Sequence, residues 1–91
     1  MTKKNEIINS EEIAIAAISF LASDLEQLTR FMSLTGIDPS SLREIAKDQE
    51  FLVAVLEYLM SDESLLITFS SQAGISPFDV TKARDRLANQ I

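Results

Sequence analysis

The chain has 91 residues with only 2 Gly and 2 Pro, a composition typical of one domain with a single hydrophobic core and long regular elements. The absence of Cys and His excludes disulfides, zinc sites with thiolate or imidazole ligands, cysteine nucleophiles and histidine general bases. The net charge of -6 opposes non-specific binding to nucleic acid and to anionic lipid, and it favours protein partners.

The N-terminal residues 1–9 are polar or mixed, and we predict no regular structure for this lead-in. Lys3 and Lys4 precede an apolar run over 13–22, as in a signal peptide, but acidic residues interrupt the region that should be positive. The run is also about half of the roughly twenty apolar residues that span a bilayer. We therefore predict neither a signal peptide nor a transmembrane helix, and we expect a cytoplasmic protein.

The first helix is predicted from Ser10, as N-cap, to about Ala22. The second helix is predicted to begin at Ser23, which forms a capping-box pattern with Glu26, and to end at Gly36. Apolar spacing predicts which side chains of the two helices face the core: Ile13, Ala14, Ala17, Ile18 and Leu21 in the first, and Leu25, Leu28, Phe31, Met32 and Leu34 in the second.

Four more helices follow, and they are predicted at 39–47, 48–60, 61–74 and 77–89. Asp48 and Ser61 are the predicted N-caps of the second and third of these helices. The stretch 65–70 also suits a strand, but its caps favour a helix. The side chains predicted to face the core are Leu42, Ile45, Ala46, Phe51, Leu52, Val55, Leu56, Leu59, Met60, Val80, Ala83 and Leu87. The helix at 61–74 runs through the apolar residues Leu65, Leu66, Phe69 and Ala73.

A four-residue corner occurs twice, as Gly36-Ile37-Asp38-Pro39 and as Gly74-Ile75-Ser76-Pro77. In each copy, Gly can adopt the left-handed conformation that ends a helix, and Asp or Ser can cap the next helix. Pro fits the first turn of that next helix. Both corners are therefore predicted to be structural.

The corners belong to an internal repeat. Residues 10–47 align with 48–85 without a gap and share eleven identities in 38 pairs, where chance would give roughly two to four. We predict an all-α fold: a single helical domain over 10–91, a compact bundle of about six helices made of two pseudo-repeated three-helix units. The alternative is that similar caps arose independently in a protein with short loops.

The second corner also has the spacing of a DNA-binding helix-turn-helix, because Gly74-Ile75-Ser76 is followed by Val80. Lys82, Arg84 and Arg86 would then contact nucleic acid from the last helix. The acidic chain and the scarcity of hydrogen-bond donors at the start of that helix argue against this hypothesis. DNA binding through the last helix remains the alternative function.

No group of residues predicts a catalytic, cofactor, metal or small-molecule site. Acidic pairs such as Asp62 and Glu63 lie where helix first turns are expected, so that capping and the helix dipole explain them. Ser71 or Ser76 with Lys82 could act as nucleophile and base, but no Gly-rich oxyanion turn accompanies them. We therefore expect a protein that is not an enzyme and carries no cofactor.

The two most apolar predicted helices, at 10–22 and 48–60, carry hydrophobic residues on more than one face. Either the bundle surrounds them completely, or part of the apolar surface meets a protein partner or a second copy of the chain. Phe78, Met32 and Met60 are the side chains whose exposure would distinguish these cases. The leading functional prediction is a protein-interaction or self-association module.

Three segments carry a resemblance to a known family, and they are 30–43, 51–59 and 62–69. Their Leu34-Thr35-Gly36 and Asp62-Glu63-x-Leu65-Leu66 patterns are the most specific parts. Over roughly residues 11–88 the chain resembles a family of short, uncharacterised alphaproteobacterial proteins, a domain of unknown function. The resemblance implies a small intracellular bacterial protein and supplies no activity, partner or site residue.

Overall fold

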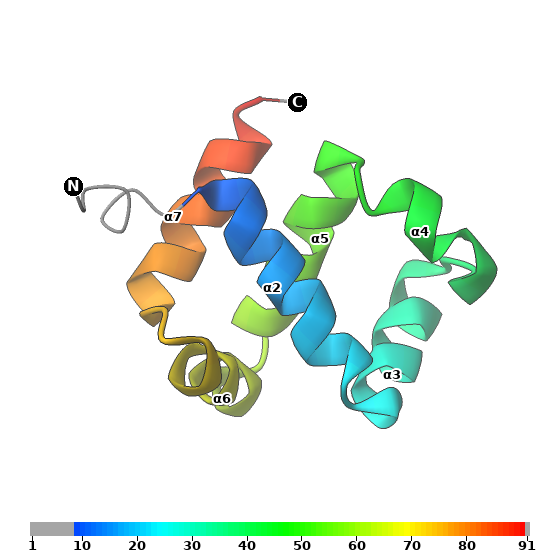
Figure 1. Ribbon diagram of the computed structural model, residues 1–91, viewed down its shortest axis with the longest axis horizontal. Coiled ribbons are helices and arrows are strands. Elements are labelled where there is room, and N and C mark those ends of the chain that lie inside the picture. The colour runs from blue at the N-terminus through cyan, green and yellow to red at the C-terminus, as the bar shows by residue number, and fades with distance from the viewer. Residues whose placement is uncertain (1–8, 91) are drawn as a thin grey trace.

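The computed structural model describes residues 9–90, and all regular structure in this range is helical (Figure 1). The elements are α2 (Ser10–Ala22), α3 (Leu25–Thr35), the 3-10 helix η1 (Pro39–Ser41), α4 (Leu42–Ile45), α5 (Gln49–Met60), α6 (Glu63–Ala73) and α7 (Pro77–Ala88). Six α-helices without a strand in the described residues confirm the all-α bundle, and also the choice of helix over 65–70. The predicted lead-in, apart from Asn9, lies outside the described residues.

Helices α2, α5 and α7 pack against one another and form the centre of the bundle. Figure 1 shows α6 and α7 on one side of the α2 and α5 pair, and α3 and α4 on the other. Helix α6 contacts all three central helices, whereas the main neighbour of α3 is α2. The fully buried large side chains are Phe31, Phe69, Leu21, Leu56, Leu59, Leu87, Val55 and Val80. Each central helix contributes to this set, so that the core runs through all three of them.

The N-caps of α2, α3 and α6 differ from the predicted ones by one residue each. Asn9, not Ser10, caps α2, because its Oδ1 accepts a hydrogen bond from the Glu11 amide at 2.7 Å. Asp24 and Asp62, not Ser23 and Ser61, cap α3 and α6.

The backbone explains why the two serines are not N-caps. Ser23 and Ser61 both have φ -80° and ψ -8°, which are helical values, whereas an N-cap needs the extended backbone found at Asp24 and Asp62. Each serine instead ends the preceding helix, and its hydroxyl donates to the carbonyl of the residue three positions earlier at 2.7 Å. The predicted cap Asp48 is confirmed, since its carboxylate accepts from the Glu50 amide.

Both predicted corners are confirmed as helix ends with left-handed glycines. Gly36 has φ 73° and Gly74 has φ 71°. Ser76 caps α7 by accepting from the Asp79 amide at 3.1 Å. Asp38 accepts instead from the Ser40 amide, only two residues on, and this tighter turn leads into η1. The single helix predicted over 39–47 is therefore wrong in detail, because the segment consists of η1 and the short α4.

Gly36→Val and Gly74→Val are each expected to lower the free energy of unfolding by about 1 to 2 kcal/mol. An added Cβ would meet no atom within 4 Å at either glycine, so the whole loss comes from forcing a β-branched residue to positive φ. Urea denaturation of the two variants measures this loss. Ser71→Val, at an exposed helical position with negative φ, is the control and should change stability by less than either. Two neutral glycine variants would contradict the structural role of the corners.

Two side chains predicted to face the core are exposed instead: Leu25 and Leu34. Leu25 is 75% exposed and Leu34 is 70% exposed, although both lie on α3. They are nine residues apart, roughly half a turn around a helix, so that one core-facing stripe cannot bury both. Helix α3 buries Phe31 and Met32, and the two leucines lie to either side of that stripe. The prediction for these two leucines was wrong because α3 packs against the rest of the bundle with one face only, the face that carries Phe31 and Met32.

Candidate functional site

The basic residues of the DNA-binding hypothesis lie on α7, but the structure gives two of them partners within the protein. The Arg84 guanidinium contacts Asp85 Oδ1 at 2.8 Å and Glu57 Oε2 at 3.1 Å. Hydrogen bonds to Asp85 and then Glu57 raise the pKa of Arg84 above its usual value. Lys82 Nζ lies 5.4 Å from the centroid of the Phe78 ring, at cation–π distance. Arg86 is exposed.

Two of the side chains considered for chemistry, Asp62 and Ser76, serve as helix N-caps. The Asp62 carboxylate accepts from the Leu65 amide at 3.2 Å, and Glu63 lies in the first turn of α6, as predicted. The Ser76 hydroxyl accepts from the Asp79 amide. Across the part of the chain that the structure describes, no three acidic side chains gather in a way that could hold a metal ion.

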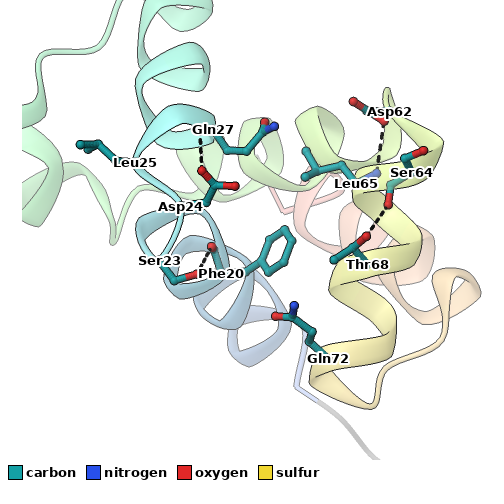
Figure 2. Close-up of a pocket in the computed structure, with 10 residues that line it drawn as sticks. All are labelled: Phe20, Ser23, Asp24, Leu25, Gln27, Asp62, Ser64, Leu65, Thr68 and Gln72. Atoms are coloured by element: carbon teal, nitrogen blue, oxygen red, sulfur yellow. Dashed lines mark hydrogen bonds between the residues drawn. The ribbon is translucent and has the colours of Figure 1, made fainter.

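A mixed hollow of about 580 Å³ lies where the end of α2 and the start of α3 face α6 (Figure 2). Several of its polar groups already have local partners. Asp24 accepts from the Gln27 amide, and the Thr68 hydroxyl donates to the Ser64 carbonyl at 2.9 Å. Tyr58 donates to the Gln27 side chain at 2.9 Å. This hollow therefore presents no reactive group of residues.

Figure 2 also shows that the Leu25 side chain points away from the other labelled residues. On that side lies an apolar groove of about 320 Å³, built by α3 and the corner that follows it. Its lining residues are Leu25, Leu28, Thr29, Met32, Ser33, Gly36 and Ile37. None of these side chains carries a charge. We call this feature the α3 groove.

The other large exposed apolar side chains are Ile15, Leu34, Ile67 and Phe78. Leu34 borders a hollow with Arg30, Tyr58 and the polar residues 61–63, not an apolar surface. Phe78 is 68% exposed, but the Lys82 ammonium lies over its ring. Unlike Leu34 and Phe78, Leu25 adjoins further apolar surface, that of the α3 groove.

Acidic residues flank the α3 groove at the Leu25 end. Asp24 and Glu26 are the sequence neighbours of Leu25. Glu26 also lines a shallow hollow beside the groove, together with Leu25, Thr29 and Arg30. Asp62, the N-cap of α6, lines the mixed hollow and is not among the residues that line the α3 groove. One carboxylate, Glu26, and one guanidinium, Arg30, thus lie in the hollow beside the uncharged groove.

Of the side chains singled out for apolar surface, Phe78 is exposed, Met32 is buried and Met60 is half-buried. Leu25 was predicted to face the core, and its exposure was not predicted from the sequence. A signal for its exposure exists, because Leu25 is the first residue of α3 and Glu63 is the first residue of α6. Both follow a capping aspartate, so that the same helical position carries a charge in the other half of the chain.

The family model described as Protein of unknown function (DUF3572) matches residues 8–90 of the chain. This match confirms the resemblance to a domain of unknown function, while the alphaproteobacterial origin stays a prediction. Neither the curated proteins nor the solved structures contain a match to the chain. No helix in residues 9–90 has the length and apolar character that crossing a membrane requires.

Proposed function

The chain belongs to this family of unknown function, and we propose that it acts as a non-catalytic protein-interaction module that binds its partner through the α3 groove. The observation that carries the proposal is Leu25, which is 75% exposed and continuous with the apolar lining of the groove. Apolar surface in contact with water raises the free energy of the protein, and a partner that covers Leu25 would remove this surface from water.

Helix formation does not require an apolar residue at position 25. The first turn of a helix favours acidic side chains because of the helix dipole, and Glu63 occupies the corresponding first position of α6. Leu25 also contributes nothing to the buried core of the protein. Its presence is therefore better explained by a contact outside the domain than by the stability of α3.

The alternative function, DNA binding through α7, has weaker support. Arg84 would have to leave Glu57 and Asp85 before it could contact a phosphate. The net charge of -6 would also oppose the electrostatic attraction that dominates non-specific DNA binding. The proposal includes a location in the bacterial cytoplasm, which the absence of cysteine fits.

A photo-cross-linking amino acid incorporated at position 25 tests the proposal in cells that express the protein. We expect discrete cross-linked products at position 25 because the partner covers this side chain. Position 34 is the matched control, since Leu34 lies on the same helix with 70% exposure but outside the groove. The products are separated by mass and identified by mass spectrometry.

Products from position 25 that equal those from position 34 would overturn the proposal, because random collisions label both exposed sites. Products from position 34 alone would overturn the assignment of the groove. A product of twice the 10.1 kDa chain mass would support self-association as the form of the interaction. A product of any other defined mass, absent at position 34, would support binding to a different protein.

A further inference from the structure

We infer that residues 25–46 open as one unit from the rest of the bundle while α2, α5, α6 and α7 stay folded. We call this segment, which comprises α3, η1 and α4, the arm. The inference goes beyond the proposed function, because it concerns a motion of the free chain and needs no partner. It rests on how little of the arm is buried and on the single cluster of side chains that holds the arm to α5.

The arm contributes little to the core. Among its described side chains only Phe31 and Met32 are buried, and α4 buries none. Its other core-facing side chains are half-buried: Leu28, Ile37, Leu42, Ile45 and Ala46. In contrast, α7, which aligns with η1 and α4 in the internal repeat, buries Val80, Ala83 and Leu87. Because burial of apolar surface is the main force that holds an element in place, the arm is held less firmly than α7.

The helices of the arm also have few neighbours in the core. Helix α3 packs mainly on α2, and the main neighbour of α4 is η1, within the arm itself. Helix α6, which aligns with α3, contacts α2, α5 and α7. Figure 1 shows the arm alone on its side of the α2 and α5 pair. Exposed links at 23–24 and 47–48 join the arm to these two helices, so that it can separate while α2, α5, α6 and α7 remain packed.

One aromatic cluster holds the arm to α5. The Phe31 ring lies edge-to-face with Tyr58 at 5.2 Å and with Phe51 at 5.8 Å. The Tyr58 hydroxyl donates to Gln27 Oε1 at 2.9 Å, and in the described part of the chain this is the only side-chain hydrogen bond between the arm and another helix. Opening of the arm breaks this hydrogen bond and uncovers the Phe51 and Tyr58 rings on α5.

The other half of the chain has the same ring contact but a longer last helix. Phe20 and Phe69, which align with Tyr58 and Phe31, lie 5.4 Å apart at an interplanar angle of 62°, against 60° for the pair in the arm. The ring contact is therefore not what distinguishes the halves. Helix α7 has 12 residues and packs on α2, α5 and α6, whereas η1 has 3 and α4 has 4. Helix α7 fixes α6 to the core, and α4 is too short to do the same for α3.

Native-state hydrogen exchange of the full chain, followed by NMR at a series of low urea concentrations, tests the inference. We expect the hydrogen-bonded amides of α3 and α4 to exchange about tenfold or more faster than the slowest amides of α2, α5 and α7. Their exchange should also rise together with urea, because a cooperative opening exposes new surface.

Two variants separate opening of the arm from unfolding of the whole domain. Tyr58→Phe removes the hydrogen bond to Gln27 and keeps the ring. Because both reactions break that bond, exchange should rise about two- to tenfold in the arm and in the slowest core amides alike. Ala83→Gly weakens α7, which stays folded when the arm opens. It should speed exchange of the slowest core amides about fivefold and leave the arm within about twofold. Circular dichroism checks that both variants are folded.

Three results would overturn the inference. Arm amides as slow as the slowest core amides, or as sensitive to Ala83→Gly, would show that the arm opens only when the whole domain unfolds. Arm amides that exchange independently of one another, without a response to urea, would show local fraying instead of one unit. Arm amides that do not respond to Tyr58→Phe would show that the aromatic cluster does not hold the arm.

Discussion

Phe31→Ala and Phe69→Ala are each expected to lower the free energy of unfolding by about 3 to 5 kcal/mol. Both rings are only 1% exposed, and they occupy aligned positions in the two halves of the chain. The Phe31 ring lies edge-to-face with Phe51 at 5.8 Å and with Tyr58 at 5.2 Å. Its removal leaves a cavity where α3 meets α5, and the loss is a large fraction of the stability of a typical small domain, about 5 to 15 kcal/mol.

Urea denaturation followed by circular dichroism measures both losses. Leu34→Ala is the control on α3, because a side chain that is 70% exposed should contribute within about 0.5 kcal/mol. A Phe31→Ala loss as small as that of the control would mean that α3 is not anchored through this ring.

Leu87→Ala is expected to lower the free energy of unfolding by about 2 to 5 kcal/mol. Helix α7 packs against both α2 and α5, and its Leu87 side chain is 1% exposed. The prediction matters because α7 has a polar composition and was the recognition helix of the DNA-binding alternative. A helix with this much buried surface is part of the core.

Thermal unfolding monitored by circular dichroism checks the effect of Leu87→Ala. Leu56→Ala in α5, at a fully buried leucine, should give a loss of similar size, and Arg86→Ala, at an exposed neighbour, should be close to neutral. A small loss for Leu87→Ala beside a large one for Leu56→Ala would show that α7 detaches easily. That result would contradict the packing of α7 described above.

Local chemistry was sufficient to predict where most helices begin and end. Gly36 and Gly74 end their helices because glycine reaches positive φ without a steric penalty, and that property depends on no distant residue. The caps of α2, α3, α5, α6 and α7 were predicted to within one residue for the same reason. The errors at Ser23 and Ser61 arose because each serine stands next to an aspartate, and either can cap a helix.

The relation between the two halves is only partly a matter of local chemistry. Their corners and caps have matching backbone conformations, as the glycines and capping aspartates show. The approximate two-fold symmetry of the halves stays a prediction.

One buried feature could not be predicted from the sequence. The Ser70 hydroxyl of α6 is buried without a hydrogen-bond partner among the described residues.

Hydrophobic spacing alone could identify apolar stripes, the all-α class and the central roles of α2 and α5, because these follow from the periodicity of a helix. Whether Leu25, Leu34 or Phe31 is buried depends on which neighbouring helices reach each side of α3, and spacing along one helix carries no such information. The α3 groove lies on a side of α3 whose exposure depends on these neighbouring helices, so spacing along the helix could not predict it. A leucine predicted to stabilise the core lies instead at the surface, at the edge of an uncharged apolar groove.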